Sequence, residues 1–265
     1  MLSIALQIAD EATAMMRQGF RAGVQVHKKG AIDLLTEYDL RVEEHIRERL
    51  RAAFPDHAIV GEEGAPRALD GRPVWYVDPI DGTSNYVHGH PFFCVSIALW
   101  DESGGHLGVV SAPALGVTWA AERGVGALRN GEPCRVSTRG ELRDALCATG
   151  FPYDRWTSDE DNLREFTAFL KRTRGVRRCG SAAIDLCLVA DGTYDIYWEQ
   201  KLNAWDLCAG AIVVAEAGGT LSGYEGEPAD PRSGRLVASN GLLHAAALET
   251  LASARRAPPS TIRGA

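Results

Sequence analysis

Two segments near the start of the chain carry hydrophobic residues at helical spacing. Residues 4–19 place apolar side chains on one stripe and end at a glycine, which is typical of an amphipathic helix. Residues 37–54 repeat the pattern, with Thr36 in the position of an N-cap and Pro55 directly after the last turn. We therefore predict two helices here.

Short apolar runs in the rest of the chain predict strands. Residues 74–77 are all apolar, and Pro79 follows them; because proline cannot donate to a sheet, we expect this strand to stop near Asp78. A strand at 58–60 would carry Glu62 just beyond its end. Further strands are predicted at 93–99, 108–112, 117–122, 145–149 and 195–198, with a tight turn at 129–132, and helices at 159–170, 181–189 and 204–217. Helices, then strands, then alternating elements favour an α+β fold.

Composition narrows the class of protein. The chain has 265 residues, of which 45% are hydrophobic and 24% charged, which suits one globular domain or two closely packed halves. The net charge of −7 argues against nonspecific nucleic-acid binding. We expect no membrane span and no signal peptide. The six cysteines form no C-x-x-C pair, so we expect reduced thiols in a cytoplasmic protein rather than a zinc site.

The residues after the apolar run 74–77 carry the clearest chemistry. Asp78 and Asp81 lie three residues apart, and two such carboxylates repel each other unless a cation neutralises them. Mg²⁺ prefers oxygen ligands of this kind. Gly82 lets the backbone approach a ligand, Thr83 supplies a hydroxyl, and the amides of residues 82–84 can face an anion. A metal beside an anion pocket indicates phosphate chemistry.

The same stretch, Asp78-Pro-Ile-Asp-Gly-Thr-Ser-Asn-Tyr-Val-His88, resembles the first signature of the inositol monophosphatases, a family of Mg²⁺-dependent, lithium-sensitive phosphatases. Residues 33–39, 61–63 and 205–219 resemble further motifs of that family, in the family's order. The resemblance implies the layered α/β/α/β/α sandwich of the inositol monophosphatase and fructose-1,6-bisphosphatase type. We expect one domain over 1–255, divided into two subdomains near 140–150, a disordered tail at 256–265, and a homodimer.

The resemblance also implies a set of metal ligands and a catalytic pair. Glu62, Asp78 and the carbonyl of Ile80 would hold one Mg²⁺. Asp78, Asp81 and Asp206 would hold a second, and Glu62 would contribute to a third. Asp39 would orient the Thr83 hydroxyl, which would accept a proton from the attacking water. Lys28 stands where the family has a lysine near the active site, although Lys29 is adjacent.

The substrate side is less specific. By resemblance, Glu199 and the backbone of Ser181 and Ala182 would bind ring hydroxyls, and substrate contacts would also come from Asp81, Gly82, Thr83 and Asp206. A carboxylate suits neighbouring hydroxyls because it accepts two hydrogen bonds. We expect hydrolysis of inositol 1-phosphate or a related small polyol phosphate. Histidinol phosphate, fructose 1,6-bisphosphate and 3′-phosphoadenosine 5′-phosphate remain open, as does a regulatory protein that binds the transcription machinery.

Overall fold

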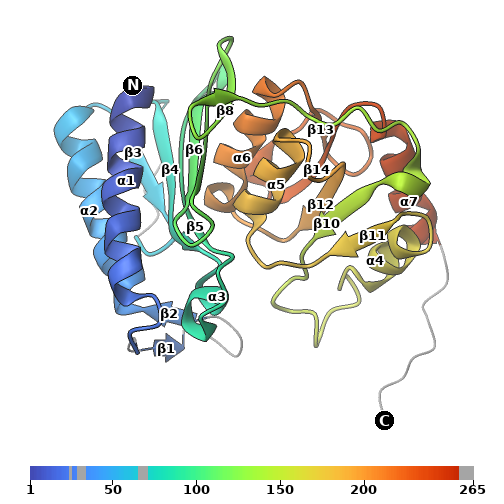
Figure 1. Cartoon of the computed structure of the whole chain (residues 1–265), viewed down its shortest axis with the longest axis horizontal. Coiled ribbons are helices and arrows are strands. Elements are labelled where there is room, and N and C mark those ends of the chain that lie inside the picture. The colour runs from blue at the N-terminus through green and yellow to red at the C-terminus, as the bar shows by residue number, and fades with distance from the viewer. Residues whose placement is uncertain (24–25, 29–33, 65–70, 257–265) are drawn as a thin grey trace.

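The computed structural model describes residues 1–23, 26–28, 34–64 and 71–256. Its helices and sheets form alternating layers (Figure 1). Helices α1 (Leu2–Gly19) and α2 (Glu37–Ala53) make one outer layer, and α4 (Leu163–Leu170) and α7 (His244–Arg256) make the other. Between them lie two sheets, with α5 (Ala182–Ala190) and α6 (Ala204–Glu216) in the middle. The fold is therefore the α+β layered type that the sequence predicts.

The larger sheet has seven strands in the order β3-β4-β5-β6-β7-β8-β9. Strands β3 and β4 are parallel, and the other neighbours are antiparallel. The strands are β3 (Ala58–Gly61), β4 (Val74–Asp81), β5 (Cys94–Asp101), β6 (Gly104–Ala112), β7 (Val117–Glu122), β8 (Gly126–Arg129) and β9 (Glu132–Pro133). One face of this sheet packs on the apolar stripes of α1 and α2, so both helices bury the apolar side that the hydrophobic spacing predicts.

The smaller sheet has five strands in the order β11-β10-β12-β14-β13. They are β10 (Leu146–Thr149), β11 (Gly175–Arg177), β12 (Ile196–Gln200), β13 (Thr220–Ser222) and β14 (Arg235–Ser239). Helices α5 and α6 are apolar nearly all round and lie between the two sheets, as expected for helices buried on every side. The remaining elements are a short hairpin of β1 (Val26–Lys28) and β2 (Leu34–Thr36), helix α3 (Thr83–His88), and 3₁₀ turns at Leu142–Asp144 and Pro231–Ser233.

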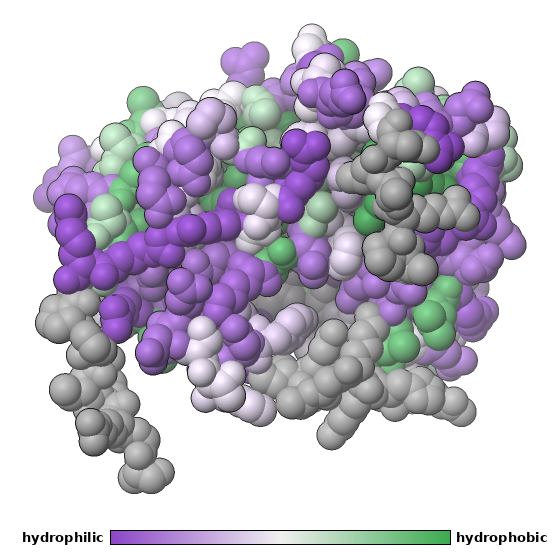
Figure 2. All heavy atoms as spheres, turned by 180° about the vertical axis from the view of Figure 1, so that it is seen from behind, coloured by the Kyte–Doolittle hydropathy of each residue, from purple (hydrophilic) through white to green (hydrophobic). Residues whose placement is uncertain are grey.

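Apolar side chains are concentrated between these layers rather than on the surface. The face opposite to that of Figure 1 is mostly hydrophilic, with only scattered apolar areas (Figure 2). Among the described residues, no helix is long and apolar enough to cross a bilayer. All six cysteines are free thiols.

The prediction that β4 stops near Asp78 is wrong. The strand continues to Asp81, and its pairing with β5 joins Asp78 to Ser96 and Asp81 to Cys94. Three steps along β4 thus face two steps along β5, which is a β-bulge, and a bulge tolerates a proline that cannot donate to the ladder. The bulge keeps both aspartates on one rigid strand.

Other departures lie in both halves of the chain, and the strands β1, β2, β8 and β9 were not predicted. β11, β13, β14 and α7 were not predicted, and the helix expected at 159–170 begins only at Leu163. The expected tail at 256–265 falls almost wholly outside the described residues, since Arg256 is the last residue of α7.

Candidate active site

One cavity of about 470 Å³ lies where β4 and α3 meet the beginnings of α5 and α6 and the end of β12. Most of the residues singled out from the sequence line it. They are Glu62, Asp78, Ile80, Asp81, Gly82, Thr83, Ser181, Ala182, Glu199 and Asp206. Asp39 lies behind Thr83. Lys28 ends β1, but its side chain and the whole of Lys29 are outside the described part of the structure.

Asp78 is the more deeply buried of the two aspartates on β4. Only 2% of its surface is exposed, and its Oδ1 accepts a hydrogen bond of 2.9 Å from the Ile80 N–H. Strands β3 and β4 are parallel, and Gly61 pairs with Val77, so the next residues, Glu62 and Asp78, are neighbours. The Glu62 N–H donates a hydrogen bond of 3.3 Å to the Val77 carbonyl. Burial and the charge of Glu62 raise the pKa of Asp78 well above its ordinary value.

Asp81 joins β4 to the start of α5, and Asp206 caps the start of α6. The Oδ2 of Asp81 accepts hydrogen bonds from the Ser181 hydroxyl at 2.6 Å and from the Ala183 N–H at 2.8 Å. Burial still raises the pKa of Asp81 to about 6. Asp206 lies in the first turn of α6, where its Oδ2 accepts the Asn203 N–H at 2.7 Å as part of a capping box. Burial and the charge of Asp81 raise the pKa of Asp206 well above its ordinary value.

Three of these carboxylates, those of Asp78, Asp81 and Asp206, have no cationic partner within the described residues. No Lys or Arg of that part of the chain forms an ion pair with Asp78, Asp81 or Asp206. Several buried acids that raise one another's pKa in this way need either protons or a cation, and their hard oxygen donors fit a divalent cation such as Mg²⁺. As they stand, however, no three His, Cys, Asp or Glu side chains among the described residues form a ready-made metal cluster. The donor set fits a metal chemically without presenting a finished ligand shell.

The second feature of the site is the contact between Asp39 and Thr83. Asp39 is fully buried in the first turn of α2, and its Oδ2 accepts both the Thr36 N–H at 2.7 Å and the Thr36 hydroxyl at 2.6 Å. This capping box fixes the carboxylate. Its Oδ1 lies 3.1 Å from the Thr83 hydroxyl, which also lies 3.0 Å from the Ile80 carbonyl oxygen. The cap of α2 therefore orients a hydroxyl on the cavity wall.

Glu199 lies on the opposite side of the cavity, near the end of β12. It is 8% exposed, and its Oε2 accepts the Tyr197 hydroxyl at 2.8 Å. A Cβ on Gly150 would lie 1.8 Å from the Glu199 Oε1, so a side chain at position 150 would displace the Glu199 carboxylate. Burial raises the pKa of Glu199 to about 7. The Ser181 side chain is held by Asp81, which leaves the backbone of Ser181 and Ala182 to face a ligand.

The structure adds cavity residues that sequence reasoning missed: Arg155, Arg178 and Lys201. Lys201 is paired with Asp154 at 2.7 Å, whereas Arg178 packs over Gly180 and lowers the pKa of Glu199 by its charge. The only sequence signal was the position of Arg178 just before Gly180-Ser181. Basic side chains therefore line this cavity together with the acids, in a chain of net negative charge.

Comparison with known proteins agrees with this geometry. Residues 1–257 match the inositol monophosphatase family. The chain is 43% identical to the inositol-1-monophosphatase of Synechocystis over 86% of this chain and 80% of that protein, and 40% identical to the Nus factor SuhB of Pseudomonas aeruginosa over 95% of both. The solved inositol monophosphatase of Anabaena superposes with a TM-score of 0.87 at 36% identity, covering 95% of both chains. On this evidence the chain belongs to the inositol monophosphatase family.

Proposed function

We propose that this chain is a Mg²⁺-dependent phosphatase that hydrolyses inositol 1-phosphate or a similar small polyol phosphate. Family membership supports a phosphatase, and members of this family are generally metal-dependent. One observation supports the finer proposal. Asp78 and Asp81, which are buried and have no cationic partner among the described residues, lie in the same cavity as Thr83, which contacts Asp39.

In this proposal Glu62, Asp78, Asp81 and Asp206, together with the Ile80 carbonyl, hold the Mg²⁺ ions. Bound Mg²⁺ would supply a water of lowered pKa and neutralise the charge of the phosphate. Asp78 and Asp81 suit this role because β4 and its bulge fix both of them on one rigid strand. The amides of Gly82 and Thr83 are proposed to contact the phosphate oxygens.

Proton transfer is assigned to Thr83 and Asp39. The Thr83 hydroxyl can donate its hydrogen to Asp39 and keep its lone pairs directed toward a water. As the water attacks, Thr83 accepts a proton and passes its own to Asp39. The capping contacts with Thr36 hold the Asp39 carboxylate throughout. We propose that Lys28 assists near the phosphate.

Substrate choice depends on the other side of the cavity. We assign to Glu199 the hydrogen bonds from neighbouring hydroxyls of the substrate, supported by its position in the same cavity as the backbone of Ser181 and Ala182. A panel of phosphate esters with Mg²⁺ tests the proposal. We expect the highest kcat/KM for inositol 1-phosphate. Higher kcat/KM for histidinol phosphate, fructose 1,6-bisphosphate or 3′-phosphoadenosine 5′-phosphate would reassign the substrate, and no hydrolysis of any ester would refute the proposed function.

A second function is favoured by one specific comparison. The 40% identity to a protein named Nus factor SuhB over nearly the whole chain supports an added regulatory role that involves the transcription machinery. A pull-down from cell extract with the wild-type chain and with Asp78→Asn would separate the two functions. Capture of transcription proteins by both forms would support a role independent of catalysis, and capture by neither would exclude it. We also propose a homodimer, which light scattering in solution would test.

A further inference from the structure

One face of α2 carries a row of buried charged residues. Asp39, Glu43 and Arg47 are spaced by four and so lie on the same side of the helix. Asp39 is 0% exposed, Glu43 is 3% exposed and Arg47 is 9% exposed. Charged side chains are rarely this buried unless specific partners hold them. Asp39 has its partners at Thr36 and Thr83, which leaves Glu43 and Arg47 to be explained.

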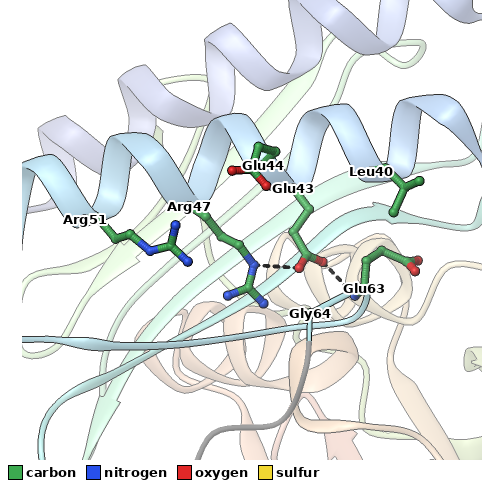
Figure 3. A pocket seen from close by; sticks show the side chains of 7 residues that line it. All are labelled: Leu40, Glu43, Glu44, Arg47, Arg51, Glu63 and Gly64. Carbon is green, nitrogen blue, oxygen red and sulfur yellow. Dashed lines mark hydrogen bonds and ion pairs between the residues drawn. The ribbon is translucent and has the colours of Figure 1, made fainter.

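Glu43 contacts the segment that carries Glu62. Its Oε2 accepts the backbone N–H of Glu63 at 2.7 Å, and its Oε1 accepts the Nε–H of Arg47, also at 2.7 Å (Figure 3). Both distances are typical of strong, charge-assisted hydrogen bonds. Arg47 in turn reaches the Ile59 carbonyl on β3 at 3.4 Å. The pair thus connects α2 to the end of β3 and to the turn that follows.

Two glycines let the chain pass close to this pair. A Cβ on Gly61 would lie 2.7 Å from the Glu43 carboxyl carbon. A Cβ on Gly64 would lie 1.9 Å from the Nη2 of Arg47. Neither position has room for a side chain while Glu43 and Arg47 stay in place. The turn at residues 61–64 is therefore fitted against the Glu43–Arg47 pair and not merely near it.

The consequence concerns Glu62, which lies between these glycines. Its own N–H is bonded to Val77 on β4, and the next N–H along the chain is bonded to Glu43. The backbone of Glu62 is thus held on one side by the strand that carries Asp78 and on the other by α2. Loss of the Glu43 contact would remove the support that α2 gives to this segment.

We propose that Glu43, backed by Arg47, is a positioning residue that holds Glu62 at the metal site. The inference rests on the proposed function, because it assumes that Glu62 is a metal ligand. It makes α2 a common support for two parts of the site: Asp39 orients Thr83, and Glu43 orients Glu62. A purely structural role for the buried pair would change the stability of the fold but not the affinity for Mg²⁺.

The test compares Glu43→Gln and Glu43→Asp with a matched control. The two partners of Glu43 bind different oxygens, so in Gln one of them would face the side-chain NH2 group instead of an acceptor. Asp keeps the charge but is one methylene shorter, which moves the carboxylate away from the Glu63 N–H. Glu165→Gln is the control, because Glu165 is a buried acid 3.4 Å from Arg255 in the outer α4–α7 layer.

Two quantities are measured for each full-length protein: the rise in Tm with added Mg²⁺, which reports binding directly, and the Mg²⁺ concentration for half-maximal phosphatase activity. Since the lost bond involves a charged group, we expect both Glu43 variants to need about tenfold more Mg²⁺ or more, with most activity recovered at saturation. Glu165→Gln should melt lower but keep the wild-type Mg²⁺ dependence.

The outcomes separate the inference from the proposed function. A wild-type protein with neither a Mg²⁺-dependent Tm nor phosphatase activity would refute the proposed function, and the inference with it. A responsive wild type whose Mg²⁺ dependence is unchanged in the Glu43 variants would refute the inference alone. If Glu43→Gln does not fold, Glu43→Asp decides in its place, since its charge still balances Arg47.

Discussion

The most informative substitution on the substrate side is Glu199→Gln. Glu199 is buried, lines the cavity, and is fixed by the Tyr197 hydroxyl at 2.8 Å and by close contact with Gly150. Gln has nearly the same shape, so the variant should preserve the packing at both places. What changes is the charge, and with it the ability to accept two hydrogen bonds from neighbouring hydroxyls.

The magnitude follows from that loss. A hydrogen bond to a charged group contributes about 1.5–3 kcal/mol when its loss leaves a buried partner unsatisfied. The kcat/KM for inositol 1-phosphate should therefore fall by roughly 10- to 150-fold. The kcat/KM for p-nitrophenyl phosphate, which has no ring hydroxyls, should hardly change. The ratio of the two values isolates the contact from any general damage to the site.

The pH dependence provides a second signature of the same contact. Because burial raises the pKa of Glu199 to about 7, its carboxylate form predominates only above that pH. In the wild type, the ratio of kcat/KM for inositol 1-phosphate to that for p-nitrophenyl phosphate should rise with pH through about 7. In Glu199→Gln the ratio should be flat.

The ionisation of Glu199 should also make the stability of the fold depend on pH. The pKa of Glu199 is higher in the folded than in the unfolded chain, where the ordinary value is 4.5. The folded protein therefore binds more protons between these values, and the stability from Glu199 is lost as pH rises from 4.5 to about 7. Glu199→Gln should gain stability relative to wild type across this range. Equal losses of kcat/KM on both substrates, with an unchanged pH profile of their ratio, would refute the assignment of Glu199 to ring hydroxyls.

Three further predictions address the catalytic side. In steady-state assays, Thr83→Ala should lower kcat at least about 100-fold with little change in KM, whereas Thr83→Ser should keep most of the activity. Equal loss of activity in both variants would indicate that Thr83 has a packing or capping role. Asp78→Asn or Asp206→Asn should lower kcat by at least about 100-fold. Without metal, Asp78→Asn should melt higher than wild type near neutral pH, because the raised pKa of Asp78 means that its ionised form is disfavoured in the folded chain; a lower metal-free Tm would contradict this. Millimolar Li⁺ should inhibit more strongly as substrate rises, and indifference to Li⁺ at saturating substrate would place the enzyme in another branch.

Local patterns were sufficient for the parts of the fold in which local preference and packing agree. The capping residue Thr36, the stripe of α2 and the apolar helices around the site could all be predicted from the sequence. The burial of the apolar run 74–77 could be predicted, and it places Asp78, the first polar residue after the run, next to the core. The passage of β4 through Pro79 could not, because it depends on pairing with β5, which accommodates the proline in a bulge.

Elements that depend on long-range contacts were missed for similar reasons. Helix α7 is rich in alanine and has a weak apolar stripe, so it is fixed by packing on β14 and α4 rather than by its own pattern. Glu43 looks like an ordinary exposed acid on a charged helix, and only the path of residues 61–64 explains why it is buried. Arg178 enters the site because the turn before α5 brings it there.

The most direct test of the proposed mechanism is to measure the release of phosphate from inositol 1-phosphate by the full chain. The release is measured with Mg²⁺, after removal of metal with EDTA, and after Mg²⁺ is restored in excess. Asp78, Asp81 and Asp206 have no cationic partner among the described residues, so we predict hydrolysis with Mg²⁺, its disappearance with EDTA, and its recovery when Mg²⁺ returns. Full activity in metal-free buffer would contradict the central proposal.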